Sequence, residues 1–123
     1  MSEVICAIST PPGMGAIAVI RLSGEGSVAL VDAIFHAASG KKLESEASHT
    51  VHFGRISDGK ELLDEVLVTL FLDSRSFTGE ESVEISCHGS VYIQQRIMEL
   101  LISRGARMAT AGEFTRRAFR NGR

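Results

Sequence analysis

The 123-residue sequence contains no tryptophan, one tyrosine, two prolines and two cysteines. The two cysteines, Cys6 and Cys87, are too few for a disulfide framework, and their apolar, strand-like surroundings indicate small buried thiols that stay reduced. The longest apolar runs, residues 4–8 and 16–20, are far shorter than the ~20 residues of a membrane-spanning helix, and the first residues form no basic leader. We therefore expect a cytoplasmic protein with no membrane segment.

Motifs for nucleotide and metal chemistry are also lacking. The glycine clusters at residues 13–15 and 24–27 do not complete the Gly-x-x-x-x-Gly-Lys-Ser/Thr phosphate loop, which argues against nucleotide hydrolysis by these residues. No Cys-x-x-Cys or His-Glu-x-x-His spacing is present, so we expect no metal ligands. Cys87 and His88 are adjacent on an expected strand and point to opposite faces, which argues against a paired nucleophile and base. No catalytic residue is assigned.

The hydrophobic and turn patterns predict one α+β domain with a mixed sheet and about three helices. Strands are expected at residues 4–9, 16–22, 50–56, 62–72, 82–88 and 107–109. Helices are expected at residues 27–36, capped by Ser27, at 90–103, capped by Ser90, and from a Thr110/Glu113 capping box onward. Asp58-Gly59 predicts a tight hairpin between two of the strands. The strand at 62–72 is apolar on both faces, which predicts a central strand in a sheet covered on both sides.

One strand has a distinct chemical face. Within residues 77–90, Ser82, Glu84, Ser86 and His88 share one parity, and Val83, Ile85 and Cys87 share the other. A strand has a period of two, so the first set lies on a polar face and the second faces a core. This polar face is either a solvated surface or a place where a ligand binds.

Arg21 is unusual because it interrupts the apolar run of residues 16–22. A charge in such surroundings needs a partner, since an unpaired buried charge costs several kcal/mol. Two interpretations remain open: a structural ion pair with Glu84 or Asp64, or a binding site for an anion.

The positive charge is concentrated at the C-terminal end. Residues 104–123 contain six arginines and one glutamate, for a charge of +5, whereas residues 1–103 carry −7. Arginine suits phosphates and carboxylates because its planar group donates two hydrogen bonds at once. The domain as a whole is not basic, so a dedicated nucleic-acid surface is the weaker interpretation.

Several motifs in one order carry a family resemblance. They are Ile-Ser-Thr-Pro-Pro-Gly at 8–13, the run at 16–24, Phe-Thr-Gly-Glu at 77–80, Val-Glu-Ile at 83–85, His-Gly at 88–89, and Gly-Glu-Phe-Thr to Asn-Gly-Arg at 112–123. Together they resemble the N-terminal domain of the tRNA modification GTPase family MnmE, also called TrmE. The resemblance covers nearly the whole chain and implies one folate-binding and dimerisation domain over residues 1–123. It implies a fold similar to the tetrahydrofolate-binding domain of the aminomethyltransferase group.

The same resemblance implies ligands and partners. Arg21, Glu84 and Arg123 match the folate-contacting positions of the family, with arginine at the last position where relatives often have lysine. The implied cofactor is 5-formyl-tetrahydrofolate or a related folate. Full-length family members act as homodimers with an MnmG-type partner on the wobble uridine of tRNA. Their helical domain and their G domain, which uses GTP, magnesium and potassium, have no counterpart here, so we interpret the chain as a fragment that is not catalytic alone.

The chemistry of the matched residues fits a folate. A pterin ring offers adjacent N–H donors that the Glu84 carboxylate can accept side by side, and Arg21 or Arg123 can bind acceptors or the anionic glutamate tail. One alternative is a tRNA-contacting module that uses Arg116, Arg117 and Arg120. Another is an independent aminomethyl-transfer enzyme, which lacks a complete set of catalytic residues in this sequence.

Overall fold

The computed structural model describes residues 3–11, 13, 15–72 and 76–122, and within them the chain folds as one α+β unit. The strands are β1 (Ile5–Ile8), β2 (Ile17–Ser23), β3 (Phe35–Ala37), β4 (Val51–Asp58), β5 (Glu61–Phe71), β6 (Ser82–His88) and β7 (Arg107–Met108). The α-helices are α1 (Ser27–Asp32), α2 (Val91–Ser103) and α3 (Glu113–Arg120), with a short 3-10 turn at Leu43–Ser45. The predicted α+β class and the number of helices are confirmed.

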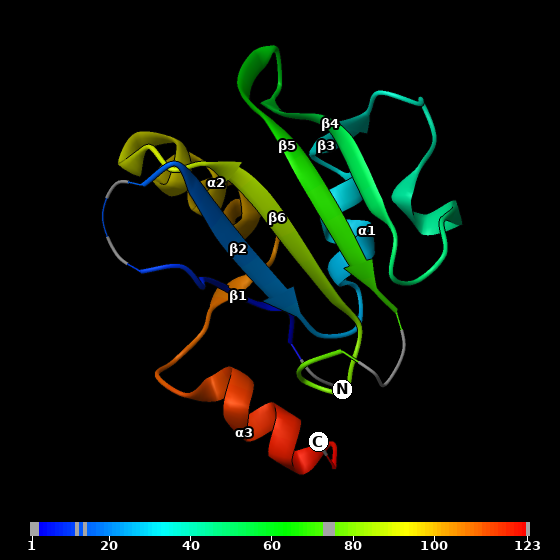
Figure 1. The fold of residues 1–123 in the computed structure, drawn as a ribbon, viewed down its shortest axis with the longest axis vertical. Coiled ribbons are helices and arrows are strands. Elements are labelled where there is room, and N and C mark those ends of the chain that lie inside the picture. The colour runs from blue at the N-terminus through cyan, green and yellow to red at the C-terminus, as the bar shows by residue number, and fades with distance from the viewer. Residues whose placement is uncertain (1–2, 12, 14, 73–75, 123) are drawn as a thin grey trace.

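The strands form one sheet in the order β3-β4-β5-β6-β2-β1-β7 (Figure 1). The neighbouring strands are antiparallel except for β1 and β7, which run parallel, so the sheet is mixed as predicted. The predicted hairpin is confirmed: Asp58 and Glu61 pair at its end, and Gly59 adopts φ +62°, which favours glycine. Strand β5 is interior, as predicted.

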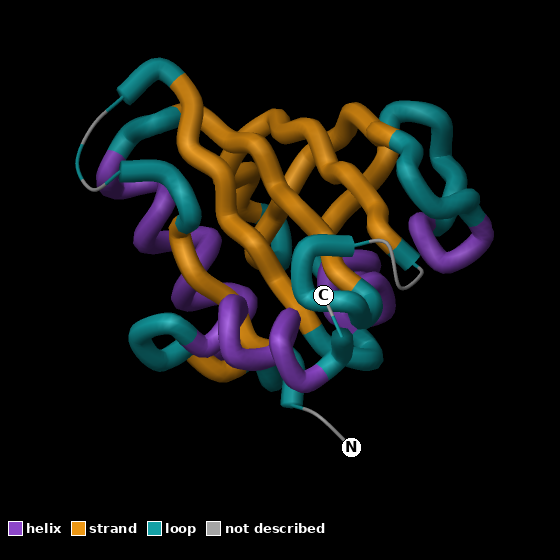
Figure 2. Tube along the Cα trace, turned by 60° about the horizontal axis from the view of Figure 1, so that its bottom comes forward, coloured by secondary structure: helices purple, strands orange, loops and turns teal. Residues whose placement is uncertain are grey.

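The hydrophobic core lies on one side of the sheet only. Helices α1 and α2 lie behind the strands in Figure 1, and Figure 2 shows the strong twist of the sheet. Val66, Val68 and Leu70 of β5 are buried against them, whereas Leu67, of the opposite parity, is 45% exposed. The expectation of a sheet covered on both faces is therefore wrong. The apolar residues on both faces of β5 therefore do not indicate helices on both sides of the sheet. We call the side of the sheet that carries Leu67, opposite α1 and α2, the open face.

The first predicted helix is shorter than expected and begins differently. It ends at Asp32, and Phe35–Ala37 forms strand β3 against β4. The Asp32 carboxylate accepts the backbone N–H groups of Leu43 and Glu44 (2.8 and 3.1 Å), which holds the returning chain at the helix end. At the start, Ser27 is not the cap, because its hydroxyl donates to the Gly24 carbonyl.

Glu81 takes over the capping of α1. Its carboxylate accepts the backbone N–H groups of Gly26 and Val28 (3.3 and 2.7 Å) at the positive end of the helix. The segment before β6 is thereby tied to the segment after β2. This long-range cap replaces the local serine cap that the sequence predicted.

The second and third helices begin near the predicted places. Ser90 caps α2 as predicted, with its hydroxyl accepting the N–H of Ile93 (3.3 Å). The Thr110/Glu113 capping box is half formed: the Glu113 carboxylate accepts the Thr110 N–H (2.9 Å), but the threonine hydroxyl also donates to that carboxylate instead of capping the helix. Helix α3 lies beyond the end of β2, below the sheet in Figure 1. No helix among the described residues is long and apolar enough to span a membrane.

A tight glycine contact at the start of β2 gives a stability prediction. A Cβ atom on Gly89 would lie 1.9 Å from the carbonyl oxygen of Gly15, where the two backbones hydrogen-bond. We expect Gly89→Ala to lower the free energy of unfolding by about 1–3 kcal/mol in urea titrations, because backbone must move to admit the methyl group. Gly15→Ala is the control, since its nearest atom would be 4.0 Å away. Equal stability of the two variants would contradict the prediction.

Candidate ligand site on the open face of the sheet

Three polar side chains form a row across three neighbouring strands of the open face. Arg21 of β2 pairs in register with Glu84 of β6, and Glu84 pairs with Thr69 of β5. Residues directly opposite each other in an antiparallel pair project to the same face. The predicted polar face of β6 is therefore confirmed, with Val83, Ile85 and Cys87 buried on the other side.

Arg21 and Glu84 form an ion pair. The Nε and Nη2 atoms of Arg21 both approach Oε2 of Glu84, at 3.0 and 2.9 Å. The side chains are 26% and 28% exposed, so the pair is only partly desolvated. Of the two partners predicted for Arg21, Glu84 is confirmed and Asp64 is not. Both bonds end on Oε2, which leaves Oε1 of Glu84 with no donor among the described residues.

Two phenylalanine rings flank Arg21. Its guanidinium carbon lies 5.2 Å from the ring centre of Phe77 and 5.8 Å from that of Phe114, within cation–π range. Phe77 also borders a hollow of about 630 Å³. It is lined by Phe77, Thr115, Ala118, Phe119 and Gly122. Arg123, the third residue expected to bind folate, lies outside the described residues.

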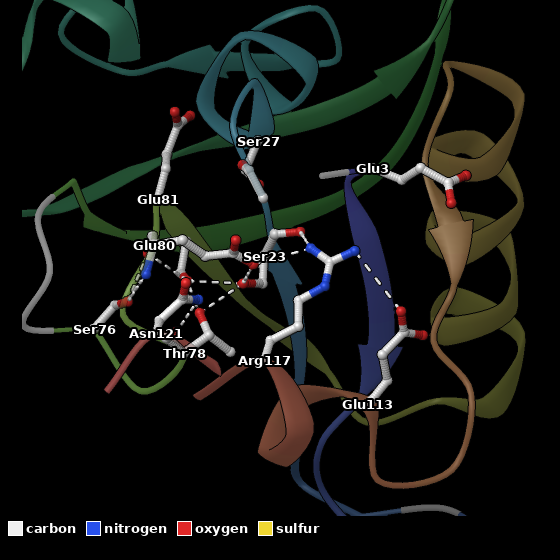
Figure 3. Close-up of polar contacts among 12 residues, drawn as sticks. Glu3, Ser23, Ser27, Ser76, Thr78, Glu80, Glu81, Glu113, Arg117 and Asn121 are labelled. Atoms are coloured by element: carbon white, nitrogen blue, oxygen red, sulfur yellow. Dashed lines mark hydrogen bonds and ion pairs between the residues drawn. The ribbon is translucent and has the colours of Figure 1, made fainter. Parts of the chain in front are cut away.

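The end of β2 meets a buried network of polar side chains (Figure 3). The hydroxyl of Ser23 lies 2.6 Å from both Thr78 Oγ1 and Glu80 Oε2. Arg117 of α3 donates from Nη1 to the Ser23 carbonyl (3.3 Å) and to Glu80 Oε2 (2.9 Å). These contacts fasten both α3 and the 76–81 segment to β2, two residues beyond Arg21.

Glu113 holds a second pair of charges next to this network. Its carboxylate accepts Nη1 and Nη2 of Arg107 at 3.1 and 2.6 Å, and Nη2 of Arg117 lies 3.7 Å away. The hydrogen bonds from Arg107, followed by the one from the Thr110 backbone, lower the pKa of Glu113 to about 2. Glu113 is therefore ionised over the ordinary pH range.

A histidine and an aspartate form a separate pair at the far end of β6. Asp64 is 9% exposed, and its Oδ1 and Oδ2 bind His88 Nδ1 (2.7 Å) and the His88 backbone N–H (2.8 Å). The sequence analysis missed this pair. The sequence did contain a sign of it: Asp64 has the same parity as Val66 and Val68, so it lies on the buried face of the strand. A carboxylate on a buried face needs a specific hydrogen-bond donor.

The cysteines are confirmed as free and buried. Burial raises the pKa of Cys6 and Cys87 to about 11, and the charge of Asp64 adds to the effect at Cys87. Cys87 faces the core while His88 is exposed, so the two do not act together. No cluster of three or more metal-ligating side chains occurs among the described residues.

The motifs that lie around this site match a known family. The family model described as GTP-binding protein TrmE N-terminus matches residues 4–123. The chain belongs to the TrmE N-terminal family. It is 51% identical over 121 residues to a protein from Flavobacterium psychrophilum, and 52% identical to proteins from Lacticaseibacillus paracasei and Bacteroides thetaiotaomicron, each named tRNA modification GTPase MnmE. Each match covers 98% of this chain and 26% of the relative, so the chain spans about a quarter of the length of these relatives.

In this TrmE N-terminal domain the C-terminal arginines differ in their surroundings. Arg117 is 5% exposed and paired inside the protein. Arg107 is bound to Glu3 and Glu113, and Arg116 donates to the Ala111 carbonyl. The positive charge of this end is thus partly used to hold the domain together.

The low pKa of Glu113 gives a pH prediction for the domain. The folded state binds the Glu113 proton more weakly than the unfolded chain, whose pKa is near the usual 4.5. The ionised carboxylate therefore stabilises the fold above pH 4.5, and this stabilisation is lost as the pH falls toward about 2. We expect Glu113→Gln to lower the melting temperature at neutral pH and to differ progressively less from wild type in acid. Glu99→Gln, at an exposed carboxylate, is the control; a Glu113→Gln difference that does not shrink in acid would refute the assignment.

Proposed function

We propose that this domain binds 5-formyl-tetrahydrofolate, or a related folate, on the open face of the sheet. The observation that carries the proposal is the partly exposed Arg21–Glu84 pair, flanked by the rings of Phe77 and Phe114. The hollow of about 630 Å³ beside Phe77 has the size of a small-molecule site. The domain acts as a binding module and not as a catalyst.

The side chains of the site fit the chemistry of a pterin. Oε1 of Glu84 is left to accept an N–H donor from the amino-pyrimidine edge of the ring in a charge-assisted hydrogen bond. The phenylalanine rings offer flat apolar surface to the heterocycle and to the aminobenzoate that follows it. Arg21 serves acceptors on the ring, and Arg123 is proposed to bind the glutamate tail.

Calorimetric titration with 5-formyl-tetrahydrofolate tests this site. We expect Glu84→Ala and Arg21→Ala each to weaken binding by about tenfold or more, because each removes one partner of a charge-assisted contact and leaves the other charge unpaired. Arg55→Ala is the matched control: it removes a charge from the same open face, where Arg55 pairs with the exposed Glu65. Folded wild-type protein that binds no folate, or variants that bind as well as wild type, would refute the proposed site.

We further propose that the open face is the surface through which two copies of the domain associate. Ile17, Val51, Phe53 and Leu67 lie on it and are 66%, 58%, 51% and 45% exposed. Three of them, Ile17, Phe53 and Leu67, line one shallow hollow of about 170 Å³, so they form a continuous apolar patch. Such patches mark association surfaces in soluble proteins.

Sedimentation of a single variant tests this surface. We expect Leu67→Arg to weaken the dimer by about tenfold or more, because it places a charge in the middle of an apolar contact. Ile102→Arg is the control, since Ile102 is 41% exposed but lies on α2, away from the open face. A dimer that survives Leu67→Arg and dissociates with Ile102→Arg would place the contact on the helical side instead.

The wider role follows from the family. We propose that the domain, with a fold like the tetrahydrofolate-binding domain of aminomethyltransferases, serves a cytoplasmic GTPase that modifies the wobble uridine of tRNA with an MnmG-type partner. GTP, magnesium and potassium belong to the G domain of that protein, since no phosphate loop is present in this sequence. The tRNA-contacting alternative is the weaker one, because Arg117 is buried and only Arg116 and Arg120 remain exposed among its three arginines.

A further inference from the structure

The two rings that flank Arg21 come from segments outside the sheet. Phe77 belongs to the 76–81 segment that precedes β6, and Phe114 lies in the first turn of α3. Neither segment pairs with a strand of the sheet. Apart from a backbone hydrogen bond from the Gly24 N–H to the Glu81 carbonyl (2.9 Å), the two segments are joined to the sheet and to each other by side-chain contacts that meet at the end of β2.

The 76–81 segment is attached through Ser23. The Ser23 hydroxyl contacts Thr78 Oγ1 and Glu80 Oε2, both at 2.6 Å, and Thr78 Oγ1 also lies 3.1 Å from Ser82 Oγ. Ser23, Thr78 and Ser82 are all buried. Because Ser23 follows Arg21 by two residues on the same strand, these contacts fix Phe77 relative to Arg21.

Helix α3 is attached at the same point. Arg117, one turn after Phe114, donates to the Ser23 carbonyl and to Glu80 Oε2, and Figure 3 shows its guanidinium between Ser23 and Glu113. Asn121, a further turn along, donates from Nδ2 to the Thr78 carbonyl (2.8 Å). Glu80 thus contacts both the strand and the helix, and it belongs to the segment that carries Phe77.

Burial makes the Arg117–Glu80 contact strong. Arg117 is 5% exposed and the Glu80 side chain 17% exposed, so neither charge can replace its partner fully with water. Separating α3 from the 76–81 segment would leave the guanidinium with one carboxylate fewer, which disfavours that separation. The Nε atom of Arg117 has no hydrogen-bond partner among the described residues, which raises the dependence of this guanidinium on its remaining contacts.

We propose that the Arg117–Glu80 ion pair is a positioning device that sets the separation of Phe77 and Phe114 around Arg21, and thereby the affinity of the site for folate. Arg117 does not touch the ligand in this proposal; it acts through the two phenylalanine rings. The affinity part rests on the proposed function, whereas the positioning part is a property of the domain alone.

A single tryptophan reports on the positioning directly. The chain has none, so Phe114→Trp introduces the only one, next to Arg21. We expect a second change, Arg117→Met, to shift its emission to longer wavelength and to increase its quenching by acrylamide. Arg104→Met, an exposed arginine after α2, is the matched control and leaves both unchanged. Phe77→Trp gives the same test from the other ring. Unchanged emission and quenching in both reporters would overturn the proposal.

Folate titration tests the consequence. We expect Arg117→Met and Glu80→Gln each to weaken 5-formyl-tetrahydrofolate binding by about tenfold. The double variant should bind about as tightly as the single variant with the lower affinity, because both substitutions remove the same contact. Arg117→Lys keeps the charge and restores part of the affinity. If Arg117→Met does not fold, Arg117→Lys and Glu80→Gln carry the test.

The outcomes separate this inference from the proposed function. A lower melting temperature with folate affinity unchanged, measured well below that temperature, would show that Arg117 is only structural and overturn the proposal. Wild-type protein that binds no folate would refute the proposed function, and the tryptophan reporters would then still decide whether Arg117 positions the rings.

Discussion

The burial of one guanidinium, that of Arg117, constrains how the C-terminal part of the chain meets the sheet. A charge held at 5% exposure needs carboxylates close by, and Glu80 and Glu113 approach it from two different segments. Glu113 is in turn bound by Arg107 of β7, so four alternating charges run from the sheet edge to the end of β2. The position of α3 follows from this chain of charges more than from apolar packing, since Ala118 is the one residue of the helix in the buried apolar set.

The one-sided core determines where function can lie. Because α1 and α2 occupy the same face, the alternation of β6 separates a buried set, Val83, Ile85 and Cys87, from a set that meets solvent or a partner. Helix α3 then closes one end of the open face, over Arg21. The other end stays apolar around Leu67. One face thus offers a polar end suited to a small ligand and an apolar end suited to a second protein surface.

Much of this arrangement is predictable from the sequence because it depends on neighbouring residues. The Asp58-Gly59 hairpin, the Ser90 cap and the two faces of β6 are local patterns, and Arg21 in an apolar run demands a partner. Residues 35 and 36 were predicted as the end of a helix because Phe35 continues the spacing of the helix before it, whereas pairing with β4 makes them part of a strand. The burial of Arg117 was not predictable, because an arginine among arginines suggests a solvated helix and its partner Glu80 lies 37 residues away.

The pairing of Arg21 with Glu84 also limits which ligands the site can select. A lone arginine in this place would attract any small anion, and an anion site was one of the interpretations that the sequence left open. With Glu84 at 2.9 Å the two charges largely cancel, so a simple anion gains little by approaching and meets the second carboxylate oxygen. A flat, neutral heterocycle that donates hydrogen bonds to Oε1 and lies against Phe77 or Phe114 gains from both features. The geometry therefore favours a flat ring that carries an N–H donor at its edge, a property of the folate proposed above.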